Sequence, residues 1–112
     1  MTQIRIGVLT PVDVAFPAIK AAFVELWPEA QLVCVLDESL YADFVNQDFT
    51  VDAQLPDAAY ARLADLLRYS RNSGAVGIIF CGSVFGPLVE AGREGLDIPV
   101  LTAFEGMIEA AF

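Results

Sequence analysis

Residues 76–87 read Val76-Gly77-Ile78-Ile79-Phe80-Cys81-Gly82-Ser83-Val84-Phe85-Gly86-Pro87, which is an apolar run, a tight polar corner and the start of a helix. This order is typical of a buried parallel strand that leads into the next helix of an α/β protein. The corner carries a thiol, a hydroxyl and several backbone N–H groups. It follows the carboxyl end of the strand, where open α/β sheets bind ligands. The stretch therefore predicts a fold class and the position of a site.

The rest of the chain alternates strand-like and helix-like segments, which we identify by their apolar periodicity. Strands are expected at 4–10, 31–36, 76–80 and 98–101, and helices near 17–27, 40–45, 56–73, 87–91 and 105–112, with a surface loop at 46–55. Strands that alternate with helices imply parallel pairing through right-handed crossovers. We predict one domain over 1–112, a three-layer α/β/α fold with a parallel sheet of about four strands, flavodoxin-like.

Two of the predicted helices carry a stripe of apolar residues at helical spacing. The first stripe consists of Ile19, Ala22, Phe23 and Leu26, with Trp27 beside it, and the second of Tyr60, Leu63, Leu66 and Leu67. Gly92 and Gly95 are expected to weaken or end the helix that begins at Pro87.

The composition limits the partners of the chain. Hydrophobic residues make up 56% of the 112 residues, and a domain of this size has much surface for its volume. Part of the apolar surface is therefore expected to face a partner, either as a homo-oligomer or as a missing second half. The net charge of −9 and the pI of about 4.1 disfavour nucleic acid and anionic membrane surfaces as partners.

The chain shows no sign of export or of metal binding. No apolar run reaches the roughly 18 residues of a membrane span, and the first residues lead directly into a predicted strand rather than a signal peptide. A cytoplasmic location is the expectation, and there Cys34 and Cys81 would stay reduced. Cys34 is interpreted as a core residue. Neither cysteine belongs to a cluster with metal-ligand spacing, so no metal site is expected.

Three strand ends are expected to meet at one edge of the sheet, and together they form the candidate site. The candidate residues are Thr10, Pro11, Cys81, Gly82, Ser83, Val84 and Thr102. The chain has no histidine, and none of its six cations falls in these corners. A carboxylate would therefore be held by hydroxyl and backbone N–H groups, the latter at the start of the helix after Ser83.

Two interpretations stay open for each polar residue of these corners. The hydroxyls of Thr10, Ser83 and Thr102 can bind a ligand, or they can make local turn and cap hydrogen bonds. Cys81 can be an inert buried residue. Alternatively, a helix N-terminus beside it can lower its pKa and favour the thiolate.

Five segments together are similar to one known family. They are Ile6-Gly7-Val8-Leu9-Thr10-Pro11, Phe23-Val24-Glu25-Leu26-Trp27-Pro28-Glu29-Ala30, Leu36-Asp37-Glu38-Ser39-Leu40, Gly77 to Pro87, and Ile98-Pro99-Val100-Leu101 followed by Met107-Ile108-Glu109-Ala110-Ala111. On these residues the chain resembles the N-terminal half of the aspartate/glutamate racemase superfamily, which includes hydantoin racemases and arylmalonate decarboxylases. The cysteine corner is the most specific of the five segments.

The resemblance implies a two-domain enzyme in which each half contributes a cysteine to a shared cleft. One thiol removes a proton next to a carboxylate and the other supplies one, without a cofactor. Gly82 directly before Ser83 resembles the decarboxylase branch, in which only the second half keeps its cysteine.

By this resemblance Cys81 and Ser83 are the candidate catalytic residues. Cys81 would be the acid or base, and Gly82, Ser83 and Val84 would supply oxyanion donors. Thr10, with Pro11 beside it, and Thr102 would hold the carboxylate of a small acid. The expected activity is that of an isomerase or decarboxylase, absent from an isolated single chain. The alternative is a noncatalytic small-ligand-binding or assembly module with the same fold.

Overall fold

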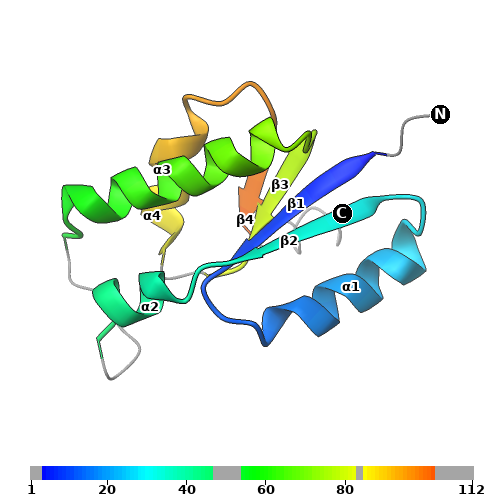
Figure 1. Ribbon diagram of the computed structural model, residues 1–112, viewed down its shortest axis with the longest axis horizontal. Helices are drawn as coiled ribbons and strands as arrows, with labels where there is room; N and C mark the ends of the chain where they lie inside the picture. Colours follow the sequence, from blue (N-terminus) through cyan, green and yellow to red (C-terminus); the bar gives the residue numbers. More distant parts are fainter. Residues whose placement is uncertain (1–3, 47–53, 83–84, 103–112) are drawn as a thin grey trace.

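The computed structural model describes residues 4–46, 54–82 and 85–102. Strands and helices alternate along them (Figure 1), in the order β1 (Arg5–Thr10), α1 (Ala15–Leu26), β2 (Gln31–Leu36), α2 (Ser39–Phe44), α3 (Asp57–Asn72), β3 (Gly77–Phe80), α4 (Gly86–Arg93) and β4 (Val100–Thr102). The four strands are parallel, in the order β2-β1-β3-β4. The predicted three-layer, flavodoxin-like fold is confirmed.

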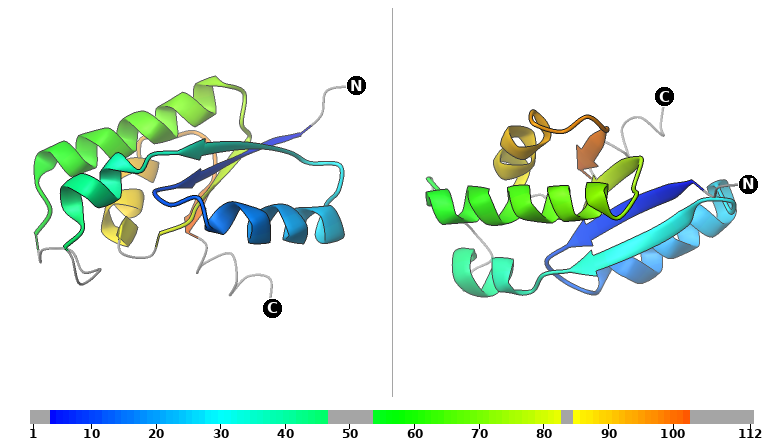
Figure 2. Two further views of the ribbon diagram at one scale, coloured as in Figure 1. Left: turned by 60° about the horizontal axis from the view of Figure 1, so that its bottom comes forward. Right: turned by 45° about the horizontal axis from the view of Figure 1, so that its top comes forward.

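The helices lie on both faces of the sheet, as right-handed crossovers require. Helices α3 and α4 cover one face and α1 lies on the other (Figure 2). Because side chains alternate along a strand, each strand sends every second residue to each face. Gly7, Leu9, Ile78 and Phe80 belong to the α3 face, and Ile6, Val8 and Ile79 belong to the α1 face.

The core lies mainly between the sheet and helices α3 and α4. Leu63 and Leu67 of α3 are fully buried there with Leu9, Phe80 and Phe85, and Leu66 packs against this cluster. Tyr60 was expected in the same stripe, but it is 36% exposed. The inward position of this first turn is held by the fully buried Ala59, four residues before Leu63.

The opposite face is covered less completely. Ile19 and Phe23 of α1 are half-buried against the sheet, whereas Ala22 and Leu26 are exposed, and Leu26 keeps 77% of its surface. Of the four apolar residues at helical spacing, Ala22 and Leu26 therefore do not contribute to the buried side of this helix. Helix α1 is the one helix on this side among the described residues, and with side chains an α-helix is only about 10–12 Å wide.

The predicted boundaries hold for most elements but not for all. Strand β3 begins at Gly77, one residue later than expected, and Val76 is 53% exposed. Strand β4 begins at Val100 instead of residue 98, and Pro99 before it has no N–H to donate to a ladder. Helix α4 continues past Gly92 to Arg93.

At Gly92 the absent side chain leaves room for Leu67, whose Cδ1 would lie 2.8 Å from an added Cβ. A requirement for close packing against α3 thus outweighs the low helix propensity of glycine there.

Some expectations concern residues that the structure does not describe. The final helix at 105–112 and most of the loop at 46–55 lie outside the described residues. Within the described part of the chain, no helix is both long enough and apolar enough to cross a membrane.

Candidate functional site

The ends of β1 and β3 lie side by side and form the candidate site. Leu9 pairs with Phe80, and one residue further the N–H of Cys81 donates to the Leu9 C=O at 2.9 Å. The pairing of the two strands therefore extends to Cys81, although β3 itself ends at Phe80. This hydrogen bond places Cys81 directly beside the turn that begins at Thr10.

Gly82 brings the two corners into contact. A Cβ at this position would lie 3.3 Å from Cδ of Pro11 and 3.0 Å from Cε1 of Phe80, both tighter than ordinary contacts. The φ of 156° would also strain any other side chain here, so glycine favours this close approach to Pro11. The predicted meeting of the Thr10-Pro11 and Cys81-Gly82 corners is thus confirmed.

Phe85 lies between this corner and α4. The Phe85 N–H donates to the Gly82 C=O at 3.0 Å, and its fully buried ring stands edge-on to those of Phe80 and Tyr41, with centroids 6.3 and 6.1 Å away. The apolar Phe85 occupies the N-cap position of α4. Ser83 and Val84, for which an oxyanion-donor role was expected, lie outside the described residues.

The hydroxyl of Thr10 is engaged within its own turn. Thr10 Oγ1 donates to the Val12 C=O at 2.7 Å and accepts the Val12 N–H at 3.2 Å, and the residue is 2% exposed. This is the local turn bonding that threonine commonly makes. To hold a ligand, Thr10 would have to give up its bond to Val12.

Thr102 lies at the same edge but belongs to the other face of the sheet. Thr102 pairs with Phe80, and Phe80 pairs with Leu9. Residues that pair across strands have their side chains on the same face, so the Thr102 side chain belongs to the α3 face. Thr10 is one residue beyond Leu9 and therefore belongs to the α1 face. The two threonines share an edge, as expected, but they do not face one another.

The thiol of Cys81 is buried and neutral. Cys81 is 7% exposed and free, and burial raises the pKa of its thiol, with a smaller contribution from Cys34. Of the two interpretations of Cys81, the direction of the shift favours the buried residue over the activated thiolate, because the cost of burying a thiolate dominates at this position. The two cysteines are separated by β1. Two strand spacings amount to about 10 Å, beyond the reach of about 7 Å between the Cα atoms of a disulfide.

Cys34 was interpreted as a core residue, but it is only half-buried. It lies on strand β2, which in the described part of the chain has a neighbouring strand on one side only.

Asp37 lies at the same edge as the candidate residues, although it was not included among them in the sequence analysis. Its N–H donates to the Thr10 C=O at 3.0 Å, and its Oδ1 accepts the N–H and hydroxyl of Ser39. Asp37 directly follows β2 and therefore lies at the same carboxyl edge, which was the signal that could have found it.

Cations do not reach this corner among the described hydrogen bonds and ion pairs. The arginines bind elsewhere: Arg5 to Ser73 and Gln31, Arg62 to Ser39 and Asp43, Arg68 to Asp65, Arg71 to Asp97, and Arg93 to the Val100 C=O. A ligand carboxylate held in the corner would therefore depend on backbone N–H groups. Within the described residues, no group of three or more Asp, Glu, Cys or His side chains is placed so that it could hold a metal ion.

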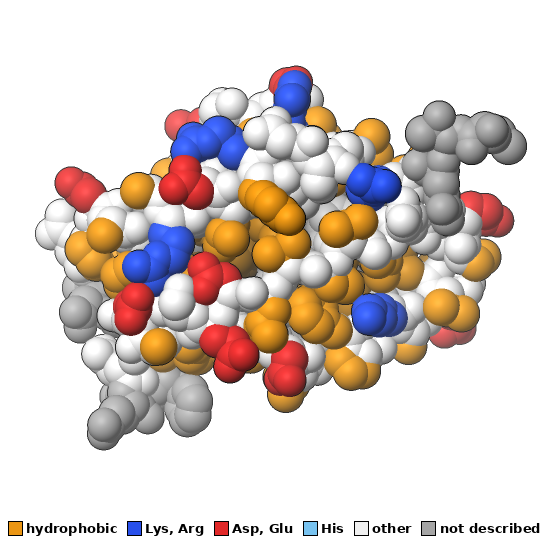
Figure 3. Space-filling model, in the orientation of Figure 1, with side chains coloured by type: hydrophobic (Ala, Val, Ile, Leu, Met, Phe, Trp, Pro, Cys, Tyr) orange, Lys and Arg blue, Asp and Glu red, His pale blue; other side chains and the backbone are white. Residues whose placement is uncertain are grey.

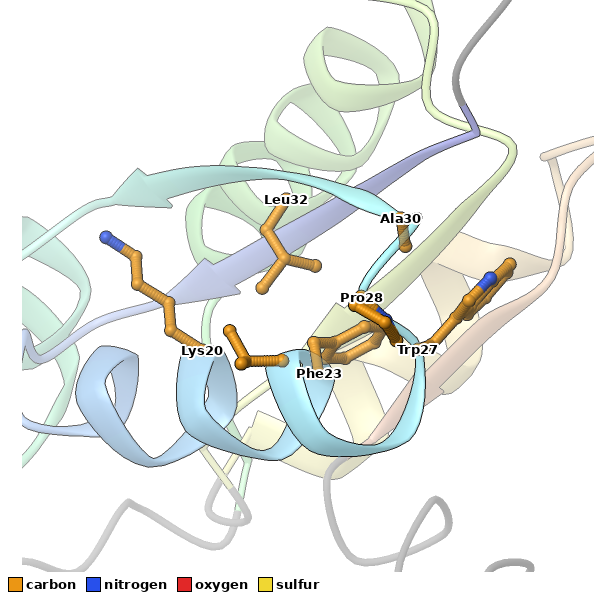
Figure 4. A pocket seen from close by; sticks show the side chains of 7 residues that line it. Lys20, Phe23, Trp27, Pro28, Ala30 and Leu32 are labelled. Carbon is orange, nitrogen blue, oxygen red and sulfur yellow. The ribbon is translucent and has the colours of Figure 1, made fainter.

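Apolar hollows lie around α1. One of about 290 Å³ opens between α1 and β2, where Leu32 points toward the helix and Phe23 and Trp27 line the far end (Figure 4). A second, of about 330 Å³, lies between Trp27 and the strands β3 and β4. These hollows mark surface on which the fold has left apolar groups uncovered.

Comparison with known proteins adds no assignment. No protein-family model matches the chain, and no curated protein matches it either.

Proposed function

We propose that this chain is one half of a cofactor-independent racemase or decarboxylase that acts on the carbon next to a carboxylate, with Cys81 as a proton donor. The proposal rests on the resemblance of the cysteine corner and on one observation of the structure. A thiol with a raised pKa lies at the carboxyl edge of the sheet, against the turn after β1. A thiol that stays protonated at neutral pH can donate a proton but is a poor base.

A protonated Cys81 suits the proton-donating step that decarboxylation and racemisation share. In the decarboxylase branch that the corner resembles, the cysteine belongs to the second half, so the proposal gives that role to the first half instead. Loss of CO2 leaves an electron pair on the α-carbon, which takes a proton from the thiol. The resulting thiolate then takes a proton from water. Racemisation also requires a base on the opposite face of that carbon, and this half would need a second half to supply it. Backbone N–H groups from Gly82 to Val84 are the proposed donors to the enolate-like oxygen.

Binding and chemistry can be tested separately. Malonate is the binding probe, and its titration should shift the backbone amide resonances of Cys81 and Gly82. Phenylmalonate is the reaction probe, and in D2O its decarboxylation should place deuterium on the α-carbon. Cys81→Ser should abolish CO2 release and deuterium incorporation, whereas the matched control Cys34→Ser should leave both unchanged.

If malonate shifts no amide of the corner, the proposed site is wrong. If malonate binds but Cys81→Ser does not reduce turnover, the corner is a binding site and Cys81 is not the proton donor. Binding without any turnover would support the expectation that a second half is needed, and adding that half should then restore a rate that depends on Cys81.

A second candidate is a noncatalytic assembly module with the same fold. Its specific support is the apolar surface around α1, where Val14, Val24 and Leu26 keep 77%, 72% and 77% of their surface exposed. This candidate predicts self-association without any response of the corner amides to malonate.

A further inference from the structure

Strand β2 is an edge strand whose sequence lacks the usual protection against pairing. Its residues, Gln31-Leu32-Val33-Cys34-Val35-Leu36, include no charge, no proline and no glycine, and it pairs with β1 alone among the described residues. Natural edge strands are commonly blunted by lysine, proline or a bulge, because their open N–H and C=O groups pair with other chains. The inner four residues are half-buried and Leu36 is 38% exposed. The strand is therefore apolar, open and about 20 Å long.

The hydrogen bonds to β1 identify the backbone groups that remain open. Gln31 donates to the Ile4 C=O at 2.7 Å and Asp37 donates to the Thr10 C=O at 3.0 Å. In a parallel strand the residues alternate between the two neighbouring sides. Odd-numbered residues therefore point to β1, and Leu32, Cys34 and Leu36 direct their N–H and C=O groups outward.

We propose that this edge is a dimer interface, on which β2 pairs antiparallel with β2 of a second copy of the chain around a twofold axis through Cys34. A twofold axis normal to the sheet keeps each side chain on its own face, so both copies can continue one sheet. In this register Cys34 meets Cys34 of the second copy, and Leu32 meets Leu36 of the second copy. All three outward residues then gain a directly opposite partner with which both backbone hydrogen bonds are exchanged.

Other symmetric registers use fewer of the open groups. An axis through Val33 pairs Leu32 with Cys34 of the second copy and leaves Leu36 beyond the end of the ladder. An axis through Val35 leaves Leu32 unpaired for the same reason. The arrangement of the open groups therefore selects the axis at Cys34.

Charge supports a second copy as the occupant in spite of the net charge of −9. The seam, by which we mean residues 31–36 of the two paired β2 strands, carries no charged side chain. Asp37, the acid that follows the strand, lies level with Gln31 of the second copy in this register, so two acids do not meet. Like charges placed opposite one another would destabilise the pairing.

The surface beside the strand is also apolar. The hollow between α1 and β2 is lined by Val24, Trp27 and Leu32, with Lys20 as its charged residue. In Figure 3 hydrophobic side chains gather across the middle of the face that carries β2 and α1, with acidic groups at its lower margin. The twofold axis puts α1 of both copies on the same face of the joined sheet, next to one another, so the interface would extend from the strand to Val24.

This inference does not rest on any activity of Cys81. Antiparallel pairing of β2 directs the carboxyl edges of the two sheets to opposite ends of the dimer. The two Cys81 corners would therefore be far apart, and each would need its own second half for two-sided chemistry. Failure of one proposal leaves the other intact.

Sedimentation equilibrium tests the interface with matched variants. The unaltered chain should sediment at twice 12.1 kDa and Leu36→Lys at 12.1 kDa, because a lysine in the seam would be buried against Leu32 of the second copy. Tyr69→Lys is the control, since Tyr69 is 62% exposed on α3, away from β2, and should leave the dimer unchanged. The double variant Leu32→Glu with Leu36→Lys should restore the dimer, because opposite charges then meet in the proposed register.

Hydrogen exchange of the unaltered chain provides a test that does not depend on variants folding. The amides of Leu32, Cys34 and Leu36 should be protected, and their exchange should speed up on dilution as the dimer dissociates. A monomeric chain with rapid exchange at these three amides would overturn the proposal. A dimer that persists in Leu36→Lys, or one that the double variant fails to restore, would overturn it as well.

Discussion

The contact between Gly7 in β1 and Ser70 in α3 can be tested by a double-mutant cycle. Ser70 is fully buried, and its Oγ has no hydrogen-bond partner among the described residues. The hydroxyl occupies the space next to Gly7, where an added Cβ would collide with it and would also lie 3.3 Å from Ser70 Cβ. Strand β1 is paired on both sides, so it cannot easily move away from the helix.

These contacts set the sign and size of each change in the free energy of unfolding. A buried hydroxyl without a partner costs about 1–3 kcal/mol, so Ser70→Ala should stabilise the protein by about 1 kcal/mol. Gly7→Ala should destabilise it by about 1–3 kcal/mol, the usual cost of overpacking a well-filled core. In the double variant the collision is gone and only the Cβ–Cβ contact remains. Gly7→Ala should therefore cost at least about 1 kcal/mol less on the Ser70→Ala background, as expected for residues in direct contact.

Urea unfolding followed by circular dichroism gives the free energy of unfolding of all four proteins. Equal slopes of this free energy against urea concentration serve as the check on two-state behaviour. A Ser70→Ala variant that loses stability would show that the hydroxyl has a partner, such as a buried water. Additive effects in the double variant would show that the collision is relieved elsewhere, and would refute the account of this contact.

Two further predictions concern Cys81 and the uneven core. At pH values below the ordinary thiol pKa of 9.0, the Cys81 thiol keeps its proton in both the folded and the unfolded chain. Above pH 9.0 the unfolded chain loses this proton first. The free energy of unfolding should therefore fall as the pH rises through the raised pKa of the folded thiol. Urea midpoints measured across this range should fall less in Cys81→Ser, and an equal fall would argue against burial of the thiol. Leu63→Ala should lower the free energy of unfolding by about 2–5 kcal/mol. The equally sized change Leu26→Ala should lower it by less than about 0.5 kcal/mol. If the two variants lower the melting temperature by similar amounts, the uneven burial of these two leucines is contradicted.

The sheet could be predicted from the sequence because its strands are short apolar runs that end at turn residues. Gln31 to Leu36 is such a run, and it is predicted to the residue. The start of β4 was misplaced because Ile98 is apolar, whereas the absence of an N–H on Pro99 excludes that part of the run from the ladder. The hydrophobicity of the residues alone does not indicate where the hydrogen-bonded part of the strand begins.

The site could be predicted only as a set of strand ends. Topology brings Thr10, Cys81 and Thr102 to one edge, and the order of strands and helices suffices to infer it. The face on which each side chain lies depends on register, which placed Thr10 and Thr102 on opposite faces. The pKa of Cys81 depends on burial by residues distant in the sequence, so a local motif could not reveal its direction. The contact of Asp37 with Thr10 likewise depends on the pairing of β1 and β2.

The central position of β1 has a consequence for the motions available to the corner. Because this strand is bonded to β2 on one side and to β3 on the other, its amides can open only when the sheet comes apart, and they should be the slowest to exchange in the native state. Cys81 is tied to that strand by its own N–H. The thiol is therefore carried by the most persistent unit of the protein, and any molecule that engages it must fit a nearly fixed geometry rather than induce one.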